Sequence, residues 1–156
     1  MGLDQYLYAN KNIGNAEWRG EVERKQFSQI ITAMNADEMV ANDEIACVNL
    51  AIKVGYWRKA NQIHHWFVNN VQDGEDECRE YPVSRKDLLE LLTVCVLAKE
   101  TPDRADELLP PLEGFFFGSY EIDEYYWQDI DHTISLLSRL LETLTDEWTF
   151  TYQSSW

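Results

Sequence analysis

The sequence predicts an α+β fold, in which a small antiparallel sheet of about three to four strands packs against about four helices. Short segments with alternating or dense apolar and aromatic residues predict the strands. Longer segments with apolar residues three and four positions apart predict the helices. No repeat or linker interrupts the 156 residues, of which 45% are hydrophobic. We therefore expect residues 1–156 to form a single globular domain with a sizeable core.

The first part of the chain is expected to hold two strands and one helix. Residues 3–8 are short and rich in aromatic and aliphatic side chains, which predicts a first strand. From Glu17 the apolar spacing becomes that of a helix. Its inner face is predicted to consist of Phe27, Ile30, Ile31 and Met34, extended less regularly by Trp18 and Val22. Residues 35–46 are polar and ambiguous, and residues 48–54 alternate as a second strand that ends at Gly55.

The next two helices follow from periodicity and from a capping signal. One is predicted over about 57–71. Its core stripe is Ala60, Ile63, Phe67 and Val71, and the residues expected nearer solvent are Arg58, Gln62, His65 and Asn69. Ser84, with Asp87 three residues later, predicts the start of the other helix, which runs to about Lys99. Its inward residues are predicted to be Leu88, Leu91, Leu92, Cys95 and Val96.

The last third is expected to contain a buried segment, a long helix and a final strand. Three phenylalanines between Gly114 and Gly118 predict a buried strand-like piece or wedge, and a helix begins near Asp123. The inner face of that helix is formed by Ile130, Ile134, Leu137, Leu141 and Leu144. Residues 147–154 alternate between aromatic and polar side chains, which predicts the last strand.

The net charge of −15 is distributed unevenly. Residues 1–104 carry 17 acids and 12 bases, whereas residues 105–156 carry 11 acids and the single base Arg139. Such a field repels nucleic acid and anionic membranes, so we expect neither as a direct partner. It attracts basic protein surfaces, although acidity also simply keeps a small protein soluble. No apolar run reaches the length of a membrane span, and three scattered cysteines are typical of reduced thiols in a cytoplasm.

Two sets of residues are candidates for binding. The first is an acidic and aromatic surface suited to a basic, nucleic-acid-binding groove of another protein. Its predicted members are Glu113, Tyr120, Glu121, Asp123, Glu124, Tyr125, Tyr126, Trp127, Asp129 and Asp131. The second is an aromatic pocket with cations that would sequester a nucleotide-type ligand. Its predicted members are Tyr56, Trp57, Arg58, Lys59, Asn61, His64 and Trp66.

The competing interpretation of the second set is structural. Its aromatic residues would then belong to the core, and Arg58 and Lys59 would pair with surface acids instead of lining a pocket. We predict no catalytic residue, cofactor or metal site. His64 and His65 point about 100° apart on a helix and cannot easily share one ion, and no Gly-x-Ser-x-Gly or P-loop signature occurs. An uncharacterised enzyme remains an alternative.

Several short segments of the sequence are distinctive enough to indicate a resemblance to a protein family. They are Gly2-Leu3-Asp4-x-Tyr6-Leu7, Gly55-Tyr56-Trp57-Arg58-Lys59-Ala60-Asn61, Gly114-Phe115-Phe116-Phe117-Gly118-Ser119 and Tyr152-Gln153-Ser154-Ser155-Trp156. With them the chain resembles a family of small, functionally uncharacterised proteins of bacteriophages and prophages, although residues 14–46 fit the family pattern poorly. The resemblance implies a phage accessory protein that acts in the host cytoplasm. Because such proteins often block host defence, the leading hypothesis is a non-enzymatic inhibitor, anti-CRISPR-like or otherwise anti-immune, that binds a host protein through the acidic surface.

Overall fold

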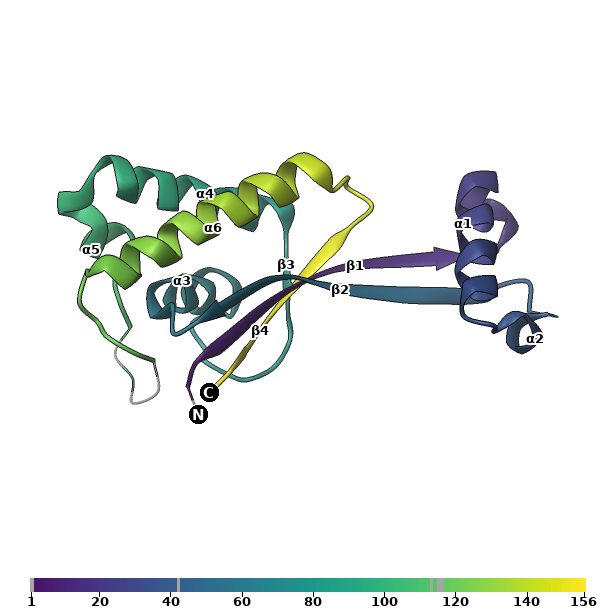
Figure 1. The fold of residues 1–156 in the computed structure, drawn as a ribbon, viewed down its shortest axis with the longest axis horizontal. Coiled ribbons are helices and arrows are strands. Elements are labelled where there is room, and N and C mark those ends of the chain that lie inside the picture. Colours follow the sequence, from purple (N-terminus) through teal and green to yellow (C-terminus); the bar gives the residue numbers. More distant parts are fainter. Residues whose placement is uncertain (1, 42, 113, 115–116) are drawn as a thin grey trace. The chain divides into compact units, whose positions relative to one another are not determined.

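The computed structural model describes residues 2–41, 43–112, 114 and 117–156. In this part of the chain, a four-stranded antiparallel sheet accompanies six α-helices, which confirms the α+β prediction (Figure 1). Two of the helices have only four residues each, so about four substantial helices remain, as expected. The chain forms two compact units, a large unit of Met1–Ala9 with Ile52–Trp156 and a small unit of Asn10–Ala51. The single domain over 1–156 stays a prediction.

The sheet has the strand order β2-β1-β4-β3. Its strands are β1 (Asp4–Gly14), β2 (Cys47–Arg58), β3 (Tyr81–Val83) and β4 (Thr149–Ser155). In the antiparallel β3–β4 pair, Tyr81 lies opposite Tyr152 and Val83 opposite Phe150, and all four side chains are buried. Strand β3 is not among the predicted strands, because a segment of three residues around Pro82 is too short to show an alternating pattern.

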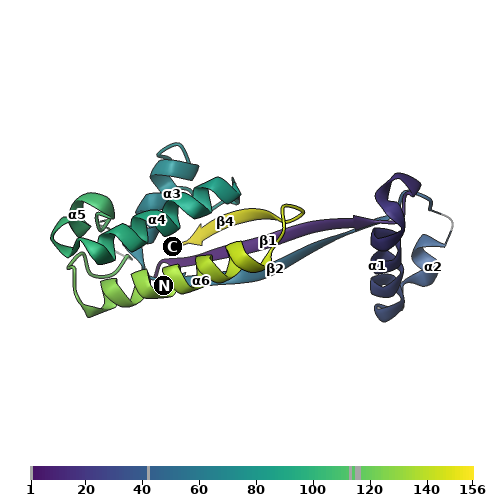
Figure 2. The same cartoon turned by 90° about the horizontal axis from the view of Figure 1, so that it is seen from above.

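The large unit is built on α3 (Asn61–Val71), α4 (Arg85–Glu100), α5 (Ala105–Leu108) and α6 (Glu124–Thr143). Helices α4 and α6 pack against one another, as Figures 1 and 2 both show. The predicted capping box starts α4: Ser84 Oγ accepts a hydrogen bond from the Asp87 N–H at 3.1 Å, and Asp87 Oδ2 accepts one from the Ser84 N–H at 2.7 Å. Asp123 caps α6 by accepting from the Tyr126 N–H at 3.0 Å.

The core of the large unit joins these helices to the sheet. Its fully buried residues include Leu7, Ile63, Phe67, Leu88, Leu91, Cys95, Ile130, Leu137 and Tyr152. Most inward positions predicted for α4 and α6 are therefore correct. Val96 is an exception, because it is exposed, while Leu92 is half-buried. Phe117 is buried as predicted, whereas Phe115 and Phe116 lie outside the described residues.

The predicted junction between the second strand and the following helix is wrong. Strand β2 does not end at Gly55 but continues to Arg58, and α3 begins only at Asn61. Gly55 is a contact point instead, since an added Cβ would lie 2.7 Å from Leu136 Cδ2. The glycine therefore allows α6 to lie close against β2. The side chains alternate from buried Trp57 to exposed Arg58, as a strand requires.

The small unit combines parts of β1 and β2 with a short 3-10 turn (Glu17–Arg19), α1 (Gly20–Ala33) and α2 (Asp37–Val40). Its core consists of Ile13, Phe27 and Ile31, with half-buried residues packed against them. The first strand thus runs well beyond residue 8. Trp18, Val22 and Met34 were predicted on the inner face of the helix, and this is wrong, because all three are exposed.

Candidate functional site

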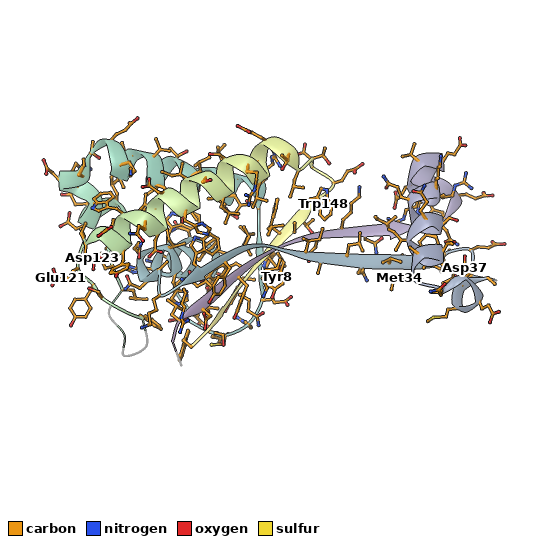
Figure 3. The ribbon with its side chains drawn as sticks, in the orientation of Figure 1. Tyr8, Met34, Asp37, Glu121, Asp123 and Trp148 are labelled. Atoms are coloured by element: carbon orange, nitrogen blue, oxygen red, sulfur yellow. The ribbon has the colours of Figure 1, made fainter. Side chains whose placement is uncertain are left out.

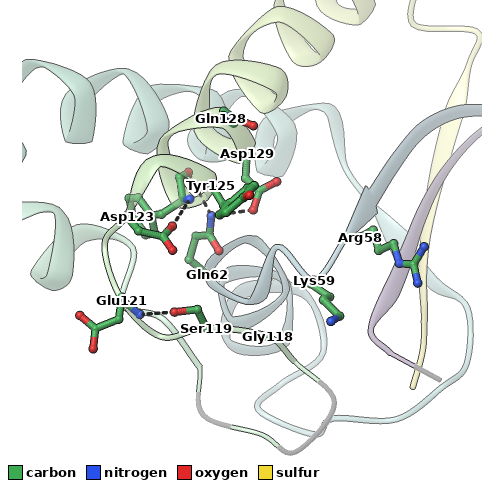
Figure 4. A pocket seen from close by; sticks show the side chains of 11 residues that line it. Arg58, Lys59, Gln62, Gly118, Ser119, Glu121, Asp123, Tyr125, Gln128 and Asp129 are labelled. Carbon is green, nitrogen blue, oxygen red and sulfur yellow. Dashed lines mark hydrogen bonds between the residues drawn. The ribbon is translucent and has the colours of Figure 1, made fainter.

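The large unit contains a pocket of about 370 Å³ where the two predicted residue sets meet. It is formed by the end of β2, the start of α3, residues 118–123 and the start of α6. Its charged lining residues are Arg58, Lys59, Glu121, Asp123 and Asp129. In Figure 4, Arg58 and Lys59 lie on one side, and Asp123, Tyr125, Gln62 and Asp129 gather on the other. The pocket is therefore bipolar, with a basic side and an acidic side.

Lys59, on the basic side, adopts an unusual backbone conformation. Its φ of 62° lies in the left-handed region, which costs a lysine roughly 1–3 kcal/mol. Its N–H donates to the Leu3 carbonyl at 2.7 Å, and its carbonyl accepts from the Asn61 N–H at 2.8 Å. Gly118 passes so close that a Cβ there would lie 3.2 Å from Lys59 Cβ. The fold thus holds this strained residue in place at the edge of the pocket.

The cations of the basic side are not neutralised by the part of the chain that the structure describes. Arg58 and Lys59 are exposed, and neither forms an ion pair with a described carboxylate. Of the two interpretations left open above, pocket lining or pairing with surface acids, the geometry favours pocket lining for both residues. Two cations beside a cavity, without an ion pair to any described carboxylate, are suited to an anionic group.

Asp129 dominates the acidic side. Burial raises the pKa of Asp129 to about 6, against the opposing effects of a hydrogen bond from Gln62 and of nearby His132. Gln62 was expected near solvent but is buried, and its amide donates to Asp129 Oδ2 at 3.4 Å. Near neutral pH, this carboxyl group can therefore accept hydrogen bonds as the anion or, in a minor fraction of molecules, donate one as the acid.

Replacing Asp129 with asparagine is expected to stabilise the protein at high pH. The folded-state pKa lies above the unfolded value, so the contribution of the carboxyl group is favourable at low pH and is lost as pH rises through about 6. We expect Asp129→Asn to raise the free energy of unfolding at pH 8 by about 1 kcal/mol, after allowing for solvent screening, and to have little effect at pH 4. Urea unfolding at both pH values tests this, with exposed Asp103→Asn as the control. An equal effect at both pH values would contradict it.

The predicted acidic and aromatic surface is only partly exposed. Tyr120, Glu121, Glu124, Tyr125 and Asp131 are exposed, and Figure 3 shows Glu121 and Asp123 close together near the start of α6. Asp131 is paired with Lys99 at 2.6 Å. Glu113 lies outside the described residues.

Two aromatic members of that surface belong largely to the interior, which corrects the prediction. Tyr126 is buried, and its hydroxyl donates to the Leu109 carbonyl at 3.0 Å. Burial raises the pKa of Tyr126. Trp127 is half-buried and packs against the core. Both residues follow the N-cap of α6, where one side of the helix must cover the core.

Most of the predicted ligand-binding residues lie in the core instead of the pocket. Trp57, Asn61, His64 and Trp66 are buried, and none lines the cavity. Tyr56 is exposed, but its hydroxyl donates to Asp4. For the aromatic residues Trp57 and Trp66, the core interpretation is therefore correct.

Asn61 acts on the pocket indirectly. Its Nδ2 donates to the Ser119 carbonyl at 2.7 Å and to the Phe117 carbonyl at 3.2 Å, while its Oδ1 accepts from the Leu112 N–H at 3.2 Å. One side chain of α3 thereby fixes the segment that carries Gly118 and Ser119, which line the pocket. Asn61 is a positioning residue.

His64 belongs to a closed polar network inside the large unit. Its Nδ1 lies 2.7 Å from Tyr152 Oη and its Nε2 lies 3.0 Å from Asp76 Oδ1. Tyr152 Oη donates to Gln5 Oε1 at 2.9 Å, and Gln5 Nε2 donates to the Ala60 carbonyl at 2.9 Å. Burial lowers the pKa of His64, whereas Asp76 opposes this effect. Because both ring nitrogens have protein partners, His64 has no ring nitrogen left to form a hydrogen bond with a ligand.

The pocket also contains residues that sequence reasoning missed. Gln62, Ser119 and Gln128 line it together with the charged groups. The one sequence signal for Gln62 is that it follows the predicted binding residue Asn61. No spacing pattern marks Ser119 or Gln128 as pocket residues. In the described ranges, no cluster of three or more His, Cys, Asp or Glu residues is arranged to hold a metal ion. None of the described helices combines the length and the apolar character needed to span a membrane.

Comparison with known proteins gives no matching family model, no matching curated protein and no matching solved structure for this chain.

Proposed function

We propose that this chain is a non-enzymatic binding protein that sequesters a small nucleotide-type ligand in the pocket between β2, α3 and α6. The observation that carries the proposal is the bipolar lining, in which Arg58 and Lys59 have no described carboxylate partner and line a cavity that is also lined by Asp129. The strained backbone of Lys59 supports it, because strain tends to persist at functional positions.

A nucleotide has the chemistry that this pocket would recognise. Its phosphate would bind the guanidinium of Arg58 and the ammonium of Lys59. The amino groups of its base would donate to Asp129, and the exposed ring of Tyr125 offers a stacking surface. A cavity of about 370 Å³ suits a mononucleotide-sized group more than a large cofactor.

We expect Arg58→Ala to weaken ligand retention by about tenfold or more, since it removes a charge-assisted contact. The tagged protein is purified from a phage-infected bacterial host, and the small molecules released by heating are identified by mass spectrometry. The nucleotide so identified is then titrated against the wild type and the variant. Arg139→Ala is the matched control, because it removes the same charge from an exposed position on α6 that does not line the pocket.

The outcomes separate the proposal from its rival. Sequestration is supported if the Arg58→Ala variant loses the nucleotide while the Arg139→Ala variant still retains it. An Arg58→Ala protein that retains the ligand at full strength would overturn it. Circular dichroism of both variants excludes loss of the fold as the cause.

A second candidate is the inhibitor of a host defence complex, favoured by the exposed acids and tyrosines around residues 120–131. Its partner would be a host protein with a basic, nucleic-acid-binding surface. In the same purification, this candidate predicts a basic protein in the eluate, with binding that weakens sharply as salt rises. The buried Tyr126 and the paired Asp131 leave it fewer free contacts than the sequence indicated. Both candidates place the protein in a phage-infected host cytoplasm, a context that rests on the resemblance given above.

A further inference from the structure

The amide of Gln62 directs its donors into the protein and leaves an acceptor for the pocket. Gln62 is only 2% exposed, although it lines the cavity. Its Nε2 donates to the Tyr126 carbonyl and to Asp129 Oδ2, at 3.4 Å in both cases. Because a carbonyl and an ionised carboxylate only accept hydrogen bonds, this orientation of the amide uses both of its hydrogens. The amide oxygen Oε1 is therefore the polar atom of Gln62 that remains for a ligand.

Two carboxylates add further acceptors beside this amide. Asp129 is half-buried, and the bond from Gln62 uses one of the roughly four lone-pair sites of an ionised carboxylate. Asp123 spends Oδ1 on the N–H of Tyr126 as the N-cap of α6. Neither carboxylate forms an ion pair with a described residue. Figure 4 shows Gln62, Asp123 and Asp129 together and apart from Arg58, and we call these three residues the acceptor end of the pocket.

The common bases differ in the donors that they can offer to such an end. Guanine has two neighbouring donors on one edge, the ring N1–H and the 2-amino group. Adenine and cytosine each have an amino group beside an unprotonated ring nitrogen, and uracil and thymine have one N–H between two carbonyl oxygens. These acceptors would face the oxygens of Asp129, and an unpaired polar contact at a half-buried position weakens binding. Of these bases, only guanine meets the acceptor end with two donors side by side.

We propose that the pocket selects guanine nucleotides, with the N1–H and the 2-amino group of the base donating to the Asp129 carboxylate and to Gln62 Oε1. This inference rests on the proposed function and adds the identity of the base to it. The phosphate stays with Arg58 and Lys59, which line the other side of the cavity. The two sides thus have separate tasks: the cations bind the phosphate of any nucleotide, and the acceptor end distinguishes one base from another.

The test is calorimetric titration of the full chain, freed of small molecules by dialysis, with the 5′-monophosphates of guanosine, inosine and adenosine (GMP, IMP and AMP). At pH 8 the Asp129 carboxyl is ionised, since its pKa is about 6. The three nucleotides share the same ribose and phosphate, and IMP differs from GMP only by the missing 2-amino group. We expect GMP to bind about tenfold or more tighter than AMP, with IMP between them.

Two substitutions separate recognition of the base from recognition of the phosphate. Asp129→Asn exchanges an acceptor for a donor, so we expect it to lose the preference for GMP and to gain affinity for xanthosine 5′-monophosphate, whose 2-oxo group accepts from the new amide. Arg58→Ala is expected to weaken GMP and AMP by the same factor, because it removes a phosphate contact. Asp103→Asn, at an exposed position that does not line the pocket, is the matched control and should leave every affinity unchanged.

Each outcome bears on one of the two proposals or on both. Equal affinities for GMP and AMP would overturn guanine selection and leave nucleotide sequestration standing. A preference for GMP that Asp129→Asn leaves intact would also overturn it, because the base would then be recognised by other residues. If none of the nucleotides binds, the proposed function fails and this inference fails with it. A preference for GMP that Asp129→Asn abolishes and Arg58→Ala preserves supports both.

Discussion

Trp57→Ala is expected to remove a large part of the protein's free energy of unfolding. Trp57 is 2% exposed, and its Nε1–H donates to Thr133 Oγ1 at 2.9 Å. Its ring also contacts Phe67, with the centroids 6.1 Å apart. Truncating a buried aromatic side chain costs about 3–5 kcal/mol, and small domains have only about 5–15 kcal/mol in total. The indole joins β2 to α6, so its loss also loosens one wall of the pocket.

Chemical unfolding of dilute protein measures this effect. Trp57→Phe keeps part of the apolar volume but loses the hydrogen bond, and we expect it to fall between the wild type and Trp57→Ala. Trp18→Ala is the matched control, since it removes the same side chain from an exposed position and should change stability by less than about 0.5 kcal/mol. If Trp57→Ala unfolded at the same denaturant concentration as the wild type, the assigned packing would be wrong.

Tyr152→Phe is expected to destabilise the protein far more than the loss of one oxygen atom suggests. The Tyr152 hydroxyl is the link between Gln5 Oε1 and His64 Nδ1, and all three side chains are fully buried. Without it, each buried polar group left without a partner costs about 1–3 kcal/mol. The ring itself still stacks on Phe67, with centroids 3.9 Å apart, so the change isolates the hydroxyl.

Tyr8→Phe provides the comparison for this substitution. Tyr8 lies on β1, is half-buried and is not a member of the network formed by Gln5, His64 and Tyr152. Its replacement should leave the unfolding midpoint nearly unchanged. Equal midpoints for the two variants would show that the polar network contributes nothing to stability. Hydrogen exchange at β4 and α3 provides a second measurement of the same network.

The elements that sequence analysis predicted well are those whose signals are local. Helix α4 begins at the Ser84–Asp87 capping box because both hydrogen bonds lie within one turn. Helix α6 has a regular apolar face over its 20 residues and an Asp123 N-cap. In both cases the pattern is long enough to be read without knowledge of the rest of the fold.

The wrong predictions concern residues whose environment is determined by tertiary packing. Gly55 looked like the end of a strand, but its missing side chain makes room for Leu136 of α6, which no local pattern reveals. Trp18 and Val22 have the spacing of an inward face, yet the small unit offers them no core to enter. Periodicity indicates which residues share a side of a helix, but not whether anything covers that side.

The candidate site was predictable in parts only. Arg58, Lys59 and Asp129 were all singled out by residue type, but they were assigned to two separate sites about seventy residues apart in sequence. The structure brings them to one pocket. Gln62 was not predicted as a pocket residue. Its contact with Asp129 forms only because α6 packs near α3, and no local sequence pattern indicates that packing.

The strand order also determines when the sheet can form during protein synthesis. Strand β4 lies between β1 and β3, yet it follows β1 by roughly 135 residues. At about 5–20 residues per second, β1 therefore waits on the order of ten seconds for its neighbour after it has been synthesised. Throughout this interval, the hydrogen-bonding edge that β4 will occupy is open to other strands. Where many ribosomes translate one message, this delay favours association between nascent chains through the open edge.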